Sequence, residues 1–185
     1  MGKEKDMRER EFITDVLCED DAALAIRREQ VKLAAIIPEL SDMVGFDQRN
    51  PHHHLDLWEH TLAAISHSEN DLKIRLALLF HDVGKPHCYT EENGIRHYKG
   101  HPEVSAKIAE ERLRALGFGE ELINGVSRLI LLHDRPLTAP FVKENPDFSS
   151  ELFKIQVCDT LAHNPLYNQR RLDYIERCKR DFGFR

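Results

Sequence analysis

Residues 72–86 read LKIRLALLFHDVGKP, and this segment decides the fold class. Its first part is apolar on most sides, which is typical of a helix at the centre of a protein. It ends in a His81-Asp82 doublet, followed by Gly84 and Pro86 where helices usually stop. Two residues that can bind a metal therefore follow directly on the most hydrophobic helix of the chain.

The rest of the chain alternates between helical patterns and turns. Apolar residues recur at helical spacing, and Pro or Gly follows most of these segments. Asn93-Gly94 lies between two short extended runs and favours a β-hairpin. We therefore expect an all-α fold, a helical bundle with a small β-hairpin near residues 87–99. The expected helices cover residues 1–18, 21–37, 57–68, 72–83, 102–116, 120–133, 150–163 and 166–180, with a proline-containing loop over residues 138–149.

Length and composition indicate a globular protein. The 185 residues fit one compact domain with a terminal extension, and we divide them into an N-terminal helical extension (1–20) and a domain (21–185). No apolar run is long enough for a membrane span, and the charged N-terminus lacks a secretory signal, so we expect a cytoplasmic protein. The net charge of −6 argues against an extended nucleic-acid surface. It leaves room for a small anionic substrate, because a metal can supply positive charge.

Residues that can bind a metal lie on the apolar face, or at the end, of four expected helices. They are His60, His81, Asp82, His133 and Asp159. Asp159 is the most informative, because a buried carboxylate loses its hydration at large cost unless a cation or several donors replace the water. Imidazole and carboxylate together suit Mn, Fe, Co, Ni or Zn. Each residue alone could be a hydrogen-bonded core residue, but several on converging helices favour a metal site.

His60, the His81-Asp82 doublet and Asp159, in this order, resemble the signature of the HD-domain family of metal-dependent phosphohydrolases. Longer stretches are similar to the HD domain of bacterial tRNA nucleotidyltransferases. They are residues 50–62 (NPHHHLDLWEHTL), 81–86 (HDVGKP) and 94–106, and the resemblance covers about residues 25–165. That family carries a nucleotidyltransferase head N-terminal to this region, and the first 40 residues show no such motif. We therefore expect the hydrolase module without nucleotide addition to tRNA.

The resemblance implies a role for each matched residue. The ligands of a first divalent metal (Mn, Fe, Co, Ni, Zn or Mg) would be His60, His81, Asp82 and Asp159. His101 and His133 lie where members with two metals place further ligands, although N-capping and an ordinary helix end are simpler interpretations of these two. Asp82 would also orient or deprotonate the attacking water.

Two cations are candidates for binding the substrate. Lys85 suggests a phosphate contact, with a charge that merely favours a helix C-terminus as the alternative. Arg135 is a weaker candidate for the same role, through the charge that grows on the phosphoryl oxygens. We expect residues 52–54, three consecutive histidines, to form a solvated loop near the mouth of the site.

The implied function is metal-assisted hydrolysis of a phosphate mono- or diester. The small-molecule substrate would be a nucleotide, including the 2′,3′-cyclic type. Two other functions stay open: a di-iron oxygenase that uses the same six residues, and a binding module that keeps the site without turnover. The basic residues of 170–185 could bind RNA in such a module, but interleaved acidic residues favour a solvated helix.

Overall fold

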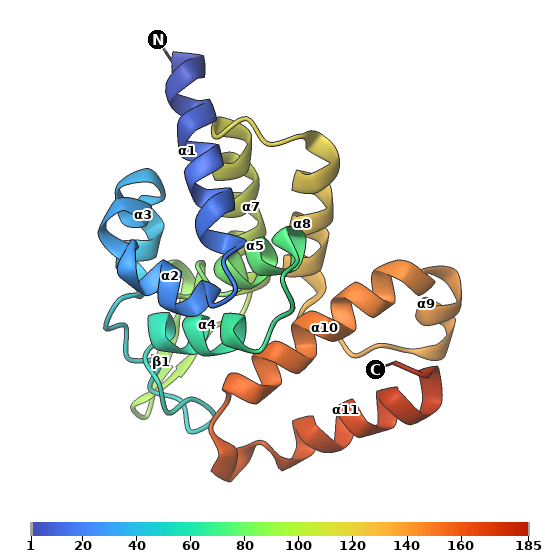
Figure 1. Cartoon of the computed structure of the whole chain (residues 1–185). Helices are drawn as coiled ribbons and strands as arrows, with labels where there is room; N and C mark the ends of the chain where they lie inside the picture. The colour runs from blue at the N-terminus through green and yellow to red at the C-terminus, as the bar shows by residue number, and fades with distance from the viewer. Residues whose placement is uncertain (1, 185) are drawn as a thin grey trace.

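The computed structural model describes residues 2–184, and its fold is all-α as predicted (Figure 1). The strands β1 (Thr90–Glu92) and β2 (Ile95–His97) form a two-stranded antiparallel sheet. The α-helices are α1 (Gly2–Leu17), α2 (Ala22–Arg28), α3 (Gln30–Ile36), α4 (Leu57–Ser66), α5 (Leu72–Phe80), α6 (Lys85–Cys88), α7 (His101–Ala115), α8 (Glu120–Leu132), α9 (Ala139–Glu144), α10 (Pro146–Ala162) and α11 (Gln169–Phe182), with 3₁₀ turns η1 (Pro38–Met43) and η2 (Pro165–Tyr167).

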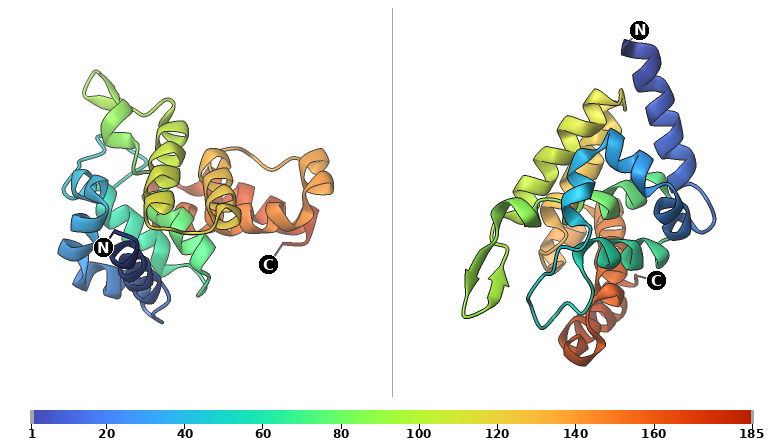
Figure 2. Two further views of the ribbon diagram at one scale, coloured as in Figure 1. Left: turned by 90° about the horizontal axis from the view of Figure 1, so that it is seen from above. Right: turned by 90° about the vertical axis from the view of Figure 1, so that its left-hand side faces the viewer.

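The central helix is α5. It packs against α1, α4, α7, α8 and α10, and every side chain from Ile74 to Phe80 is buried. Asp71 begins the helix, because its carboxylate accepts a hydrogen bond from the Ile74 amide at 3.1 Å. Figure 2 shows α7 and α8 side by side over this helix. The His81-Asp82 doublet, which follows α5, therefore lies in the interior of the protein.

The helices α10 and α11 form a pair at the C-terminal end of the chain (Figure 1). Tyr174 of α11 donates a hydrogen bond from its hydroxyl to Oε1 of Gln156 on α10, at 2.8 Å. Ile175 and Cys178 are the buried residues of α11. The short turn η2 between the helices places the first residues of α11 next to the last turns of α10, where Asp159 lies.

The structure corrects one expected helix and one expected loop. The expected helix over residues 21–37 is two helices, because Glu29 leaves helical dihedral angles (φ −97°, ψ 11°). The expected loop over residues 138–149 contains α9 and the first turn of α10. Pro140 and Pro146 lie in the first turns of these helices, where proline costs no hydrogen bond.

The hairpin is confirmed at residues 90–97. Asn93 and Gly94 both have positive φ (51° and 77°), which the tight turn requires. The division of the chain at residue 20 stays a prediction; α1 packs against α2 and α5 and buries Ile13, Val16 and Leu17.

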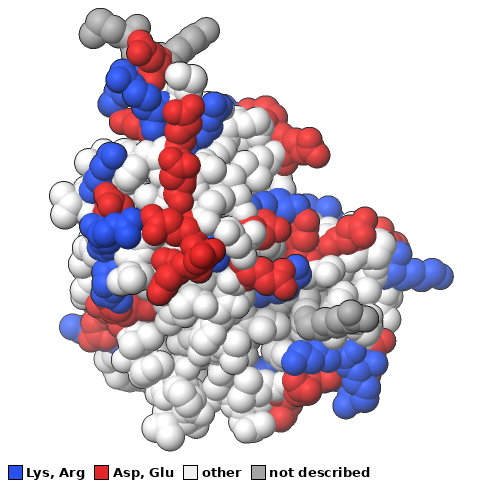
Figure 3. All heavy atoms as spheres, in the orientation of Figure 1, with Lys and Arg blue, Asp and Glu red and all other residues white. Residues whose placement is uncertain are grey.

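Surface charge and hydropathy add two observations. None of the helices in residues 2–184 is long and apolar enough to cross a membrane. On the face drawn in Figure 3, acidic and basic side chains are interspersed.

Arg75 is a buried cation that joins α5 to the end of α1. The residue is 3% exposed, and its Nη1 donates to the carbonyl oxygens of Leu17 at 2.6 Å and Glu19 at 2.8 Å. Carbonyls at the end of a helix lack partners within the helix. Arg75 therefore completes the hydrogen bonding of the end of α1.

Arg75→Met should lower the free energy of unfolding by about 3 kcal/mol, measured by urea denaturation. Methionine keeps the aliphatic stem but leaves the carbonyl oxygens of Leu17 and Glu19 without the Arg75 donor. The control is Arg114→Met, which removes an exposed ion pair with Glu120 and should leave the free energy of unfolding close to that of wild type. Equal losses in the two variants would show that Arg75 contributes no more than a surface charge.

Candidate metal centre

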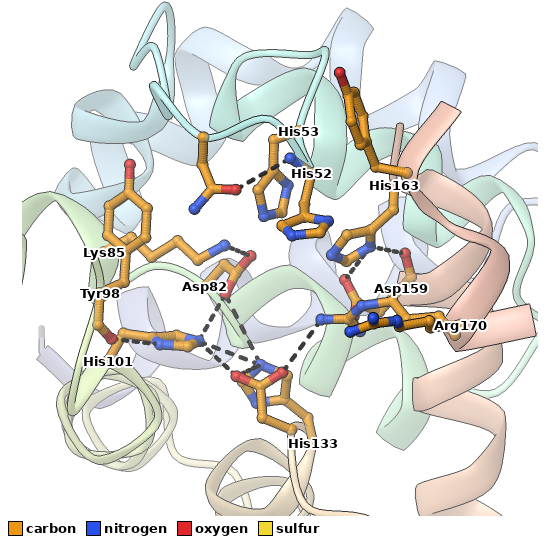
Figure 4. Close-up of a pocket in the computed structure, with 14 residues that line it drawn as sticks. His52, His53, Asp82, Lys85, Tyr98, His101, His133, Asp159, His163 and Arg170 are labelled. Atoms are coloured by element: carbon orange, nitrogen blue, oxygen red, sulfur yellow. Dashed lines mark hydrogen bonds and ion pairs between the residues drawn. The ribbon is translucent and has the colours of Figure 1, made fainter. Parts of the chain in front are cut away.

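The six residues expected to bind metal lie together in the interior. The structure places His60 on α4, the His81-Asp82 doublet after α5, His101 at the start of α7, His133 after α8 and Asp159 on α10. Figure 4 shows four of them, Asp82, His101, His133 and Asp159. All six are buried, with exposed fractions of 7% or less. Five helices from distant parts of the sequence therefore converge on one cluster.

Asp82 lies at the middle of the cluster. Its Oδ1 is 3.0 Å from His101 Nε2 and 3.9 Å from His133 Nε2. Its Oδ2 is 3.2 Å from His81 Nε2 and 3.6 Å from His60 Nε2. The carboxylate thus faces four imidazoles, two through each oxygen.

Asp159 forms the other end of the cluster. Its Oδ1 is 3.0 Å from His60 Nε2 and 3.7 Å from His81 Nε2. His163 also belongs here: its Nδ1 lies 3.5 Å from the same oxygen. Three overlapping groups have donor atoms close enough to share a cation: His60-Asp159-His163, His60-His81-Asp82 and Asp82-His101-His133.

Backbone carbonyls orient the imidazoles. The Nδ1 atoms of five histidines face carbonyl oxygens: His60 with Ala162, His81 with Leu78, His101 with Tyr98, His133 with Ile130 and His163 with Asp159, at 2.7–3.3 Å. A carbonyl only accepts, so each Nδ1 carries a proton, and this leaves Nε2 free to bind a metal. Such carbonyl bonds fix ligand rings in metal sites.

Several atoms of the cluster lack a suitable partner within the protein. His81 Nε2 and Asp82 Oδ1 are buried without a hydrogen-bond partner among the described residues. His101 Nε2 and His133 Nε2 lie 3.3 Å apart and would oppose two lone pairs when both Nδ1 atoms are protonated. A divalent cation would satisfy both arrangements, so the donor set fits a metal ion.

The pKa shifts agree with this interpretation. Burial opposes the ionisation of Asp82, but the charges of His81 and Lys85 outweigh it and hold its pKa well below the usual range. The pKa of Asp159 is likewise low despite burial, through His163 and His60. Burial opposes charge on His81, yet Asp82 and Asp159 raise its pKa to about 10. The two ionised carboxylates therefore draw positive charge into the cluster.

A comparison with known protein families identifies the family that has this arrangement. The model of the HD domain matches residues 31–164. This chain belongs to the HD domain family. The matched region contains all six residues described above. The HD domain family comprises metal-dependent hydrolases.

Curated relatives of this HD domain are tRNA nucleotidyltransferases. The CC-adding tRNA nucleotidyltransferase of Thermus thermophilus is 36% identical over 170 residues, which cover 84% of this chain and 39% of the relative. The A-adding tRNA nucleotidyltransferase of Deinococcus radiodurans is 29% identical over 139 residues, covering 68% of this chain and 32% of the relative. The chain thus spans less than half the length of either relative, and the similarity concerns the region that contains the HD domain.

A cavity of about 370 Å³ opens beside the cluster of the HD domain. Lys85 lines it and is buried; its Nζ lies 2.7 Å from Asp82 Oδ2 and 3.0 Å from Gln48 Oε1. His52 and His53 of the histidine loop also line the cavity, whereas His54 is exposed and does not. Arg135 is not among the lining residues; its side chain is exposed and borders a separate cavity.

Two residues that contact Asp159 were not anticipated from the sequence. His163 follows Asp159 by four residues, one helical turn, and this spacing could have identified it. Arg171 of α11 donates from Nη1 to Asp159 Oδ2 at 3.0 Å, and its Nη2 lies 3.8 Å from Asp134 Oδ1. Arg171 lies beyond the matched region, on a helix that the sequence presents as an ordinary charged surface.

Arg171→Gln is expected to weaken metal binding about tenfold, measured by competition with a chelator. The guanidinium holds Oδ2 of Asp159 and so directs Oδ1 toward His60, and glutamine cannot maintain this ion pair. Direct repulsion between the Arg171 guanidinium and a metal ion is reduced by solvent, because the Arg171 side chain is 42% exposed. Arg180→Gln, at the exposed far end of α11, should leave the affinity unchanged. Unchanged affinity in Arg171→Gln would show that Asp159 needs no such support.

Proposed function

We propose that this HD domain hydrolyses a phosphate ester of a nucleotide, either a mono- or a diester, including the 2′,3′-cyclic type. The main support is the meeting of two buried carboxylates and several oriented imidazoles beside a cavity that also contains a buried lysine. The names of the relatives, which are nucleotidyltransferases, agree with a nucleotide substrate.

Two metal positions fit the donors. His60, His81 and Asp82 would hold one divalent ion, with Asp159 as a fourth ligand because its Oδ1 lies 3.0 Å from His60 Nε2 and 3.7 Å from His81 Nε2. Asp82, His101 and His133 would hold a second ion. When bound, such an ion supplies Lewis acidity and lowers the pKa of water. His163 is a further donor beside Asp159, and burial lowers its pKa to about 4, which keeps the ring neutral.

Residues of the chain supply the remaining chemistry. Asp82 belongs to both donor groups, so its carboxylate would bind metal and can orient or deprotonate the attacking water beside phosphorus. Lys85 offsets the negative charge that develops on the phosphoryl oxygens. The Lys85 ammonium donates a hydrogen bond to Oε1 of Gln48 at 3.0 Å. This bond holds the ammonium at the edge of the cavity.

The test is an activity assay of the purified protein with Mn, Co, Ni or Mg. Its substrates are bis-p-nitrophenyl phosphate, nucleoside monophosphates and 2′,3′-cyclic nucleotides. We expect turnover of at least one of these esters that depends on added metal. Absence of turnover with every metal, in protein that retains metal, would overturn the proposed function.

Lys85→Met should lower kcat on the order of 100-fold while metal content stays within twofold of wild type. Methionine keeps the length of the side chain but removes the charge near the phosphoryl oxygens. Lys107→Met, at an exposed position of α7, serves as the matched control and should keep full activity. A Lys85→Met protein with wild-type kcat would remove this residue from the mechanism.

Iron content, visible absorption and RNA binding, measured on the same purified protein, distinguish the other two functions. Bound iron with visible absorption, together with no ester hydrolysis, would favour a di-iron oxygenase. Salt-sensitive RNA binding without turnover would favour a binding module.

A further inference from the structure

Arg170, the second residue of α11, has a guanidinium that forms no ion pair within the described residues. It lines the metal cavity and also a neighbouring cavity of about 200 Å³, whose other walls include Thr160 and Tyr174. Within residues 2–184, no carboxylate lies within ion-pair distance of its guanidinium, and no hydrogen bond engages it. The side chain is exposed at the rim of the cavity.

The other cations of the site and of α11 already have partners. Lys85 pairs with Asp82, and Arg171 pairs with Asp159. Further along α11, Lys179 pairs with Glu176, Arg180 pairs with Asp181, and Arg177 lies over the Tyr174 ring. Arg170 therefore differs from its neighbours on the same helix, because it combines an open guanidinium with a position on the cavity wall.

Lys85 and Arg170 lie on opposite sides of the cavity. Figure 4 shows Lys85 and Tyr98 on one side of Asp82, and Arg170 beside Asp159 on the other. The aromatic side chains of His52 and Tyr167 line the cavity as well, with their rings 6.2 Å apart. A ligand with one phosphate at the metal cluster and a nucleoside beside these rings would extend toward Arg170.

We propose that Arg170 binds a second anionic group of the substrate, so that the preferred ester is a nucleotide with a further phosphate. This inference rests on the proposed function. Its chemical basis is the planar guanidinium, whose five donors match the oxygens of a phosphate and can bind two of them at once. Substrates without the second phosphate leave Arg170 solvated and lose that contact.

The experiment measures binding by calorimetry to the full chain loaded with Mn²⁺. The probes are adenosine 3′,5′-bisphosphate and the two corresponding monophosphates. The wild type should bind the bisphosphate about tenfold more tightly than either monophosphate, the gain expected for one charge-assisted hydrogen-bonding contact. Arg170→Gln should abolish this preference and change the affinity for the monophosphates less than twofold.

The matched control is Arg177→Gln, which removes a charge from the same helix at a position outside the cavity. It should keep the wild-type preference. The subsite is overturned by a preference that survives in Arg170→Gln, by an equal loss in Arg177→Gln, or by no preference in the wild type. Binding that depends on Arg170 without hydrolysis of any ester would retain the subsite and overturn only the proposed function.

Discussion

Asp82→Asn is expected to remove the bound metal and to lower kcat/KM for a phosphodiester by on the order of 10³-fold or more. Asp82 is 2% exposed and belongs to both the His60-His81 and the His101-His133 donor groups. Asparagine keeps the shape of the side chain but lacks the negative charge and offers one oxygen in place of two. Both candidate metal positions therefore lose an anionic ligand in a single substitution.

Metal content and kcat/KM should be measured on the same preparation of the Asp82 variant. Asp173→Asn is the control, since this residue lies on the exposed surface of α11 and contacts Gln169. It should retain both metal and activity. An Asp82→Asn protein that keeps its metal and most of its activity would contradict the central role of this carboxylate.

Gly84→Ala should destabilise the protein by about 2–3 kcal/mol and displace His101 from the cluster. A Cβ atom on Gly84 would lie 2.8 Å from the Ser105 amide nitrogen and 2.9 Å from the His101 carbonyl oxygen. Both are backbone atoms of α7, so the helix itself must move. Because His101 is the first residue of α7, the movement should reach the metal centre.

Gly125→Ala, in the middle of α8, is a matched control for this steric effect. The added Cβ would meet only the flexible end of Lys73, at 3.2 Å. Alanine is the better helix former, so this variant should be as stable as wild type or up to about 1 kcal/mol more stable. Urea denaturation measures both variants. Wild-type stability in Gly84→Ala would mean that α6 and α7 can separate at little cost.

The sequence could predict that the cluster exists because its candidate ligands interrupt apolar patterns. His81 and Asp82 follow the most hydrophobic helix, and Asp159 occupies a helical face that is otherwise buried. A charge at such a place requires a partner, and this requirement holds whatever the packing of the helices. The hairpin was predictable for a similar reason, since Asn93-Gly94 suits the positive φ of its turn.

Other parts of the site depend on how the helices pack. Arg171 lies on a charged helix, and only the packing of α11 against α10 brings it to Asp159. Arg135 follows His133 by two residues, but its side chain borders a different cavity. Adjacent residues at a helix end can face different sides of the protein, so proximity in sequence does not decide this question.

The most direct test of the account is a crystal structure of the protein with Mn²⁺ and an anomalous difference map. We expect one or two peaks within bonding distance of Asp82, with His60, His81 and Asp159 around one position and His101 and His133 around the other. Peaks confined to the surface, with none between these imidazoles and carboxylates at saturating Mn²⁺, would contradict the claim that the cluster binds metal.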